Sequence, residues 1–175
     1  MSSDSIDSGA NGSERAYIAL GSNLGDSGAL LREAFRVLQG LSAAPLVASS
    51  LWRTTPVDCP PHSPAFINAV IALAPLPNET PEALLGKLQQ IEKNFGRRPK
   101  IVMNEPRPLD LDLIAFGSET RNFPQLILPH PRAHLRRFVL EPLAEIAPEF
   151  VLPGQKKTVR ELLEALRTDE VTAKI

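Results

Sequence analysis

Apolar residues follow alternating and helical patterns that divide this chain into a series of predicted strands and helices. Short apolar or alternating runs predict strands over 16–21, 46–53, 66–73, 107–116 and 123–128. Apolar residues spaced three and four apart predict helices over 30–41, 81–95, 135–146 and 158–167. Thr80 caps the second helix and Gly96 ends it, and Pro142 is expected to bend or split the third.

The order strand, helix, strand, strand, helix, strand predicts an α+β fold with a ferredoxin-like βαββαβ core. Such a core has an antiparallel sheet with both helices packed on one face, and here C-terminal helices are added. The opposite face of the sheet is then expected to serve as a binding floor. Residues 1–15 are mostly Ser, Gly, Asp and Asn, so we expect a disordered N-terminal tail, a single domain over 16–167 and a C-terminal tail over 168–175.

Composition narrows the class of protein without indicating a function. A length of 175 residues suits one domain, and a net charge of -1 with 43% hydrophobic residues gives no argument for nucleic acid or membrane binding. Cys59 is the only cysteine, which excludes an intrachain disulfide and favours a reducing compartment. With no secretory signal pattern and no apolar run of membrane-spanning length, we expect a cytoplasmic protein, and we expect it to be a monomer.

The most informative stretch reads Arg-Pro-Leu-Asp-Leu-Asp-Leu-Ile-Ala-Phe, from 107 to 116. Asp110 and Asp112 are two residues apart in a predicted strand, so both carboxylates leave the same face. Neighbouring like charges disfavour a strand unless a cation neutralises them. Mg²⁺ prefers such carboxylates together with phosphate oxygens. The alternative is that the pair forms the solvated face of an edge strand.

Positive residues gather in two Pro-rich segments of the chain. The first contains Arg97, Arg98, Lys100 and Arg107, and the second contains Arg132, Arg136 and Arg137. Together with the acidic pair they indicate a polyanion held partly through metal. Gly21 and Gly25 could cradle a phosphate, but the loop lacks the spacing and the lysine of a P-loop, so we favour a substrate-side loop.

Asn68 and His130 stand at unusual positions for polar residues. Asn68 lies inside an apolar strand, where its amide is either bonded to nearby backbone or reserved for a ligand. His130 lies between two prolines and therefore points from a rigid loop. His130 and His134 could ligate a transition metal, although hard phosphate chemistry does not need imidazole ligands.

Five motifs, in one order, resemble the 6-hydroxymethyl-7,8-dihydropterin pyrophosphokinase family over about residues 16–153. They are Ala-Tyr-Ile-Ala-Leu-Gly-Ser-Asn-Leu-Gly at 16–25, Arg-Thr-Thr-Pro at 53–56, Phe-Ile-Asn-Ala at 66–69, Arg-Pro-Leu-Asp-Leu-Asp at 107–112, and Pro-His-Pro-Arg followed by Arg-Phe-Val-Leu-Glu-Pro-Leu between 129 and 143. The resemblance implies a Mg²⁺-dependent enzyme of folate biosynthesis. It would transfer the β,γ-diphosphate of ATP to the pterin hydroxymethyl group and release AMP.

The resemblance also implies roles for the residues at matching positions. Two Mg²⁺ ions would be held by Asp110 and Asp112, with Arg97 and Arg107 completing the catalytic set. ATP would contact Gln89, Glu92, Arg97, Arg107, Leu113, His130 and Arg136. The pterin would contact Thr54, Pro56, Val57, Phe66, Asn68, Asp110 and Phe138. A flat heterocycle suits two aromatic faces and a few fixed donors and acceptors, but without the resemblance the two phenylalanines are ordinary core.

Two other functions compete with this interpretation. A metal-dependent hydrolase or nucleotidyl transferase could use the same aspartates without needing Asn68, Phe66 and Phe138. A ferredoxin-like RNA-binding or sensor domain would need exposed aromatic residues on a basic face, and only 5% of this chain is aromatic. We therefore expect ATP and hydroxymethyldihydropterin as small-molecule partners, and neither nucleic acid nor a membrane.

Overall fold

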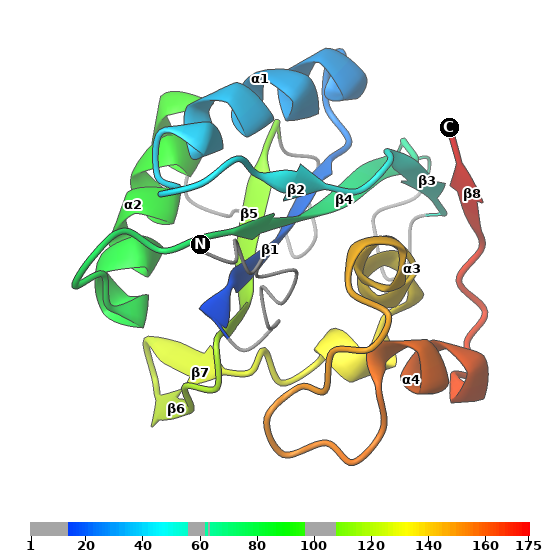
Figure 1. The fold of residues 1–175 in the computed structure, drawn as a ribbon. Helices are drawn as coiled ribbons and strands as arrows, with labels where there is room; N and C mark the ends of the chain where they lie inside the picture. Colours follow the sequence, from blue (N-terminus) through cyan, green and yellow to red (C-terminus); the bar gives the residue numbers. More distant parts are fainter. Residues whose placement is uncertain (1–13, 56–61, 63, 97–107) are drawn as a thin grey trace, which may run out of the picture.

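The computed structural model describes residues 14–55, 62, 64–96 and 108–175 (Figure 1). Its strands are β1 (Ala16–Ser22), β2 (Val47–Ala48), β3 (Trp52–Thr54), β4 (Phe66–Leu73), β5 (Asp110–Phe116), β6 (Arg121–Phe123), β7 (Leu126–Leu128) and β8 (Thr172–Lys174). Its helices are α1 (Ser27–Gln39), α2 (Pro81–Asn94), a short 3-10 helix (Ala133–Leu135), α3 (Arg137–Ile146) and α4 (Val159–Ala165).

The main sheet is antiparallel and has the strand order β5-β1-β4-β3-β8, with β2 also paired to β4. Along the chain, β1, α1, β3, β4, α2 and β5 follow one another in the predicted βαββαβ order, which confirms the α+β fold. β1 lies between β4 and β5, with Gly21 opposite Asn68 on one side and Asp110 on the other. β6 and β7 form a separate hairpin.

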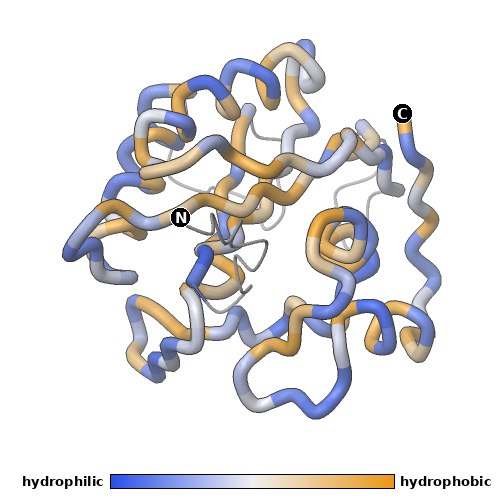
Figure 2. Tube along the Cα trace, viewed as in Figure 1, coloured by the Kyte–Doolittle hydropathy of each residue, from blue (hydrophilic) through white to orange (hydrophobic). Residues whose placement is uncertain are grey.

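One face of the sheet packs against α1 and α2. Ile18, Leu20 and Ile71 from the strands are buried against Leu31 and Leu88 of these two helices. Local signals start both helices, because Asp26 accepts a hydrogen bond from Ala29 N and Thr80 accepts one from Ala83 N, each at 3.1 Å. Figure 2 shows hydrophobic and hydrophilic residues alternating along these helices, whereas β4 is almost uniformly hydrophobic.

The opposite face is partly covered by α3 and α4, so the expectation that it is entirely free needs correction. Tyr17, Val70 and Ile114 are buried there against Val139 and Leu140 of α3. Figure 1 shows α3 lying against this side of the sheet, across from α1. The Pro142 ring is buried within α3, which runs through it as one helix. The candidate binding floor is therefore the part of this face near the end of β1 that carries Gly21.

Three predicted segments differ in detail from the structure. The strand expected at 46–53 is two short strands, because the Ser49 hydroxyl accepts the Val70 N–H at 2.9 Å and interrupts the regular ladder. The strand expected at 123–128 is the β6-β7 hairpin. The expected C-terminal tail, 168–175, contains β8, which pairs with β3. Within the described part of the chain, none of the helices has both the length and the apolar character needed to cross a membrane.

Candidate active site

A single row of residues crosses the sheet at the end of β1. Trp52 on β3 lies opposite Asn68 on β4, Asn68 lies opposite Gly21 on β1, and Gly21 lies opposite Asp110 on β5. Directly opposed residues of antiparallel strands share a face, so all four side-chain positions face the side on which α3 packs. Asp112 lies on the same face, two residues further along β5. The register therefore brings the predicted pterin amide and the predicted metal carboxylates to one floor.

Asn68 is held in a fixed orientation on this floor. Its Nδ2 donates a 2.7 Å hydrogen bond to Thr54 Oγ1, and both residues are buried. Thr54 lies opposite Phe66, so Thr54, Phe66 and Asn68, three of the residues predicted to bind the pterin, form one continuous patch. The Asn68 side-chain oxygen lies over Gly21, at 3.0 Å from the point where a Cβ would stand. The amide of Asn68 is thus bonded to a side chain and its oxygen is directed over the floor.

Gly21 places no side chain between Asn68 and Asp110, so Gly21→Ala is expected to weaken binding on this floor. The added methyl would lie 3.0 Å from Asn68 Oδ1 and 3.9 Å from the Phe66 ring, and would displace the amide. We expect KM for the pterin to rise about tenfold, equal to about 1.4 kcal/mol, with KM for ATP unchanged. Gly86→Ala, where nothing lies within 4 Å of the new methyl, is the matched control. Equal KM values for the two variants would contradict this role for Gly21.

Asp110 and Asp112 are half-buried and lie within electrostatic reach of positive side chains. The charge of Asp112, followed by those of Glu170 and Asp110, favours the charged form of Arg136. Burial and the nearby Arg132 act in the opposite direction and lower the pKa of Arg136. Among the described residues no group of three or more His, Cys, Asp or Glu could hold a metal ion. The donor set of two carboxylates suits Mg²⁺ that takes its remaining ligands from substrate phosphates and water.

His130 lies beside these carboxylates as a neutral donor. Its backbone N–H donates to Ile114 O at 2.8 Å, and its Nδ1 accepts the Arg132 N–H at 3.2 Å. Because Nδ1 accepts, the ring proton is on Nε2. Burial, followed by the charges of Arg136 and Arg132, lowers the pKa of His130 from 6.5 to about 4. At neutral pH the imidazole can therefore offer an Nε2–H to an anion.

The low pKa of His130 also predicts how stability changes with pH. In the unfolded chain His130 takes up a proton near pH 6.5, whereas the folded protein does so only near 4, so protons favour unfolding between these values. The free energy of unfolding should fall as the pH drops from 6.5 towards 4. His130→Gln should lose less stability between pH 7.5 and 5 in urea unfolding than the wild type or His134→Gln. A variant that loses as much as the wild type would rule out this titration.

The residues predicted to bind ATP are distributed over both faces of β5. Glu92 is buried on α2 and its Oε2 accepts the Leu111 N–H at 2.9 Å, which ties α2 to the strand carrying the aspartates. Gln89 is exposed on the same helix. The Leu113 side chain is buried in the core on the α1 and α2 face, so only its backbone could reach a ligand on the aspartate face. Arg136 lies over the Phe138 ring, 5.3 Å from its centre.

Several other predicted residues lie outside the described part of the chain. They are Pro56, Val57, Arg97 and Arg107. The floor also includes Trp52, which none of the sequence motifs indicated, although Trp52 alternates with Thr54 along the chain. Glu170, which hydrogen bonds to Phe138 N, has no signal in the sequence around it.

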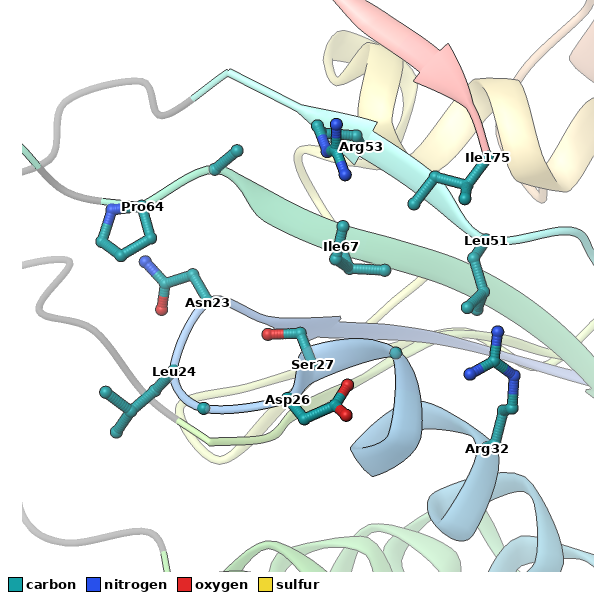
Figure 3. A pocket seen from close by; sticks show the side chains of 13 residues that line it. Asn23, Leu24, Asp26, Ser27, Arg32, Leu51, Arg53, Pro64, Ile67 and Ile175 are labelled. Atoms are coloured by element: carbon teal, nitrogen blue, oxygen red, sulfur yellow. The ribbon is translucent and has the colours of Figure 1, made fainter.

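A separate cavity of about 450 Å³ lies on the other face of the sheet (Figure 3). Arg53 and Ile67 line it, and each is next in sequence to a floor residue, so its side chain points the opposite way. The loop of Asn23, Leu24 and Gly25, which we expected on the substrate side, also lines this cavity. The cavity is therefore distinct from the floor that carries Asn68 and the aspartates.

Comparison with known proteins identifies the family of this chain. Residues 17–148 match the sequence model of the family described as 7,8-dihydro-6-hydroxymethylpterin-pyrophosphokinase (HPPK). The chain is 39% identical over 153 residues to the 2-amino-4-hydroxy-6-hydroxymethyldihydropteridine pyrophosphokinase of Pseudomonas aeruginosa, a match that covers 87% of this chain and 91% of that protein. It is 42% identical over 132 residues to the enzyme of the same name from Bacillus subtilis, covering 75% and 77%.

Solved structures support the fold independently of sequence. Wild-type Plasmodium falciparum HPPK-DHPS with pteroate superimposes with a TM-score of 0.69 at 13% identity, covering 86% of this chain and 44% of that chain. The matched family region contains β3, β4, β5, α3 and all of β1 except its first residue, so it includes the described residues of the floor. The chain belongs to the 7,8-dihydro-6-hydroxymethylpterin-pyrophosphokinase family, the pyrophosphokinases of folate biosynthesis, which use ATP as co-substrate.

Proposed function

We propose that this protein transfers the β,γ-diphosphate of ATP to the hydroxymethyl group of 6-hydroxymethyl-7,8-dihydropterin, and that Mg²⁺ is required. The observation that carries the proposal is the row in which Gly21 separates Asn68 from Asp110. An amide that can both donate and accept stands on one side of Gly21, and two carboxylates stand on the other. This arrangement supports a flat heterocycle lying across Gly21 with its reactive group directed towards the aspartates.

In the proposed reaction the pterin hydroxyl oxygen attacks the β-phosphorus of ATP. A new bond forms between that oxygen and the β-phosphorus, and the bond from the β-phosphorus to the α,β-bridging oxygen breaks. AMP leaves with the bridging oxygen, and the hydroxyl proton passes to solvent. No residue is needed as a general base, because phosphoryl transfer has a loose transition state in which the attacking oxygen carries little charge.

The described residues would bind and orient the reactants. Asn68 and Thr54 would recognise the pterin edge, with Phe66 and Phe138 against its faces. Arg136 and the neutral Nε2–H of His130 would contact phosphate oxygens. Arg97 and Arg107 are proposed for the same triphosphate, on the resemblance alone.

Asp110 and Asp112 are the residues that would hold the metal, and we propose two ions. When bound, Mg²⁺ would neutralise the charge that develops on the equatorial and leaving oxygens of the transferred diphosphate. Among the described residues, Arg136 offers one positive charge that acts on both carboxylates, against two carboxylates and a triphosphate. The charge balance of the floor therefore supports metal binding together with ATP. We further propose that the protein acts as a cytoplasmic monomer.

The test is to incubate the purified protein with Mg²⁺, ATP and 6-hydroxymethyl-7,8-dihydropterin and to separate the nucleotides. AMP that appears in step with a diphosphorylated pterin would support the proposed transfer. ADP as the product would indicate transfer of one phosphoryl group. AMP or phosphate formed equally fast without the pterin would indicate the metal-dependent hydrolase. Omission of Mg²⁺ should abolish AMP formation, and its re-addition should restore it.

A further inference from the structure

The segment Glu170–Lys174, here named the C-terminal strap, joins two walls of the candidate pterin site. One edge of the strap bonds to β3, where Thr54 pairs with Thr172 and Trp52 pairs with Lys174. Thr55 N donates to Val171 O at 3.1 Å. The strand that carries Thr54, the hydrogen-bond partner of Asn68, is therefore held on its outer edge by the strap.

The other edge of the strap contacts α3 at two points. Glu170 Oε2 accepts the Phe138 N–H at 3.1 Å, and Lys174 Nζ pairs with Glu145 Oε2 at 3.0 Å. The seven helical steps from 138 to 145 rise about 10 Å, and the four strand steps from 170 to 174 span about 13 Å, so the two segments are similar in length. Figure 1 shows the strap running beside α3 on its way to β3.

Glu170 supplies a capping acceptor that the residues next to the start of α3 do not provide. The N-cap residue of α3, Arg136, makes no side-chain capping hydrogen bond. The first N–H groups of a helix have no partner within the helix, and a negative group there is favourable. The Glu170 carboxylate therefore acts as a cap supplied from 32 residues away. The residue it caps, Phe138, is the proposed aromatic wall of the pterin site.

We propose that Glu170 is a positioning residue that holds Phe138 against the pterin floor. This inference rests on the proposed function, because it assigns Glu170 to the same substrate site. By accepting the Phe138 N–H, Glu170 fixes the first turn of α3 relative to the strap, and β8 fixes the strap relative to Thr54. One segment near the C-terminus therefore holds both walls of the pterin site in place. The Glu170 charge also favours the charged form of Arg136, which lies over the Phe138 ring.

The test compares Glu170→Ala, Glu170→Gln and Asp169→Ala. Glu170→Ala removes the acceptor, and we expect KM and calorimetric Kd for the pterin to rise about tenfold, the usual scale of a lost cap. Its kcat and KM for ATP should stay within about threefold of the wild type. Glu170→Gln keeps an acceptor oxygen and should remain within about twofold. Asp169→Ala removes an exposed neighbouring charge and should behave as the wild type.

Hydrogen exchange at the Phe138 amide gives a readout that does not depend on turnover. Exchange should be faster in Glu170→Ala and nearly unchanged in Glu170→Gln, with thermal unfolding reporting whether each variant is folded. Pterin binding is measured with Mg²⁺ and a nonhydrolysable ATP analogue present.

The possible outcomes separate this inference from the proposed function. Pterin affinity in Glu170→Ala equal to that in Asp169→Ala would overturn the positioning role. So would an equal loss of pterin and ATP affinity, because that pattern indicates general disorder of the domain. A wild-type protein that binds the pterin but forms no AMP would refute the diphosphate transfer alone. A wild-type protein that does not bind the pterin would overturn both.

Discussion

Asp110→Ala and Asp112→Ala should each lower kcat by about a thousandfold or more, while the protein remains folded. Both carboxylates lie on one face of β5, and their charges act on Arg136 beside the same floor. A triphosphate approaching them needs additional positive charge, and each carboxylate would hold metal that supplies it. Removal of either one leaves the developing charge on the diphosphate without compensation. The loss should therefore appear in kcat.

The folding control for this prediction follows from the same geometry. Asp110→Asn and Asp112→Asn preserve shape, and each removes one of two neighbouring like charges together with its attraction to Arg136, so their thermal midpoints should stay close to that of the wild type. Their activity should need higher Mg²⁺ concentrations for half-saturation, because an amide is a weaker ligand than a carboxylate. Folded variants with normal turnover would exclude a two-metal role for this pair. Lost activity with a collapsed thermal midpoint would be a structural effect instead.

Asn68→Ala is expected to raise KM for the pterin about a hundredfold, equivalent to about 2.7 kcal/mol, and to leave KM for ATP unchanged. Asn68 is buried, its Nδ2 is bonded to Thr54 Oγ1, and its oxygen lies over Gly21. Sites built to hydrogen-bond a polar substrate lose most when one buried partner is removed, because polar groups are left unpaired. Steady-state kinetics with each substrate varied in turn measures this split.

Two variants separate recognition by Asn68 from its support of the fold. Thr54→Val removes the acceptor of the Asn68 bond but keeps the amide, so we expect a smaller rise in KM, about tenfold. Asn122→Ala removes an exposed amide on β6 and should change nothing. A hydrolase that uses only the aspartates would keep its activity in Asn68→Ala. That result would exclude the pterin assignment of this floor.

Patterns over a few neighbouring residues predicted much of the fold. The period-two alternation of Asp110 and Asp112 with leucines places both carboxylates on one face of β5. Thr80 caps α2 through Ala83 N, three residues away, and β4 spans the predicted residues, Phe66–Leu73. These features depend on backbone geometry within one element, so the sequence specifies them locally.

Other predictions failed where the interaction that decides them is distant in sequence. β8 looked like part of a tail because three residues cannot form a stable strand without the edge of β3 beside them. The split at Ser49 depends on a hydrogen bond to Val70, 21 residues away. The face expected to be free is partly covered by α3, whose apolar side gave no indication of which face of the sheet it would cover.

The candidate site also combines features that the sequence predicts with features that depend on contacts between distant segments. Its separate motifs, including Asn68, the aspartate pair and His130, could be recognised from the sequence, and the family resemblance grouped them. Their arrangement in space could not be recognised from the sequence. It depends on the register of β1 with both β4 and β5, which places Gly21 between Asn68 and Asp110. Glu92 docking on Leu111 N and Glu170 capping Phe138 join residues 19 and 32 apart.

By itself, the sequence determined the family, the order of the core strands and helices, and which residues are candidates for the chemistry. These depend on residue type and local period, which a linear pattern contains. The tertiary structure alone decided which face α3 covers, that Gly21 lies between Asn68 and Asp110, and that a strap near the C-terminus joins β3 to α3. Those features come from contacts between segments far apart in the chain, whose register and packing are set only when the sheet and its helices assemble together.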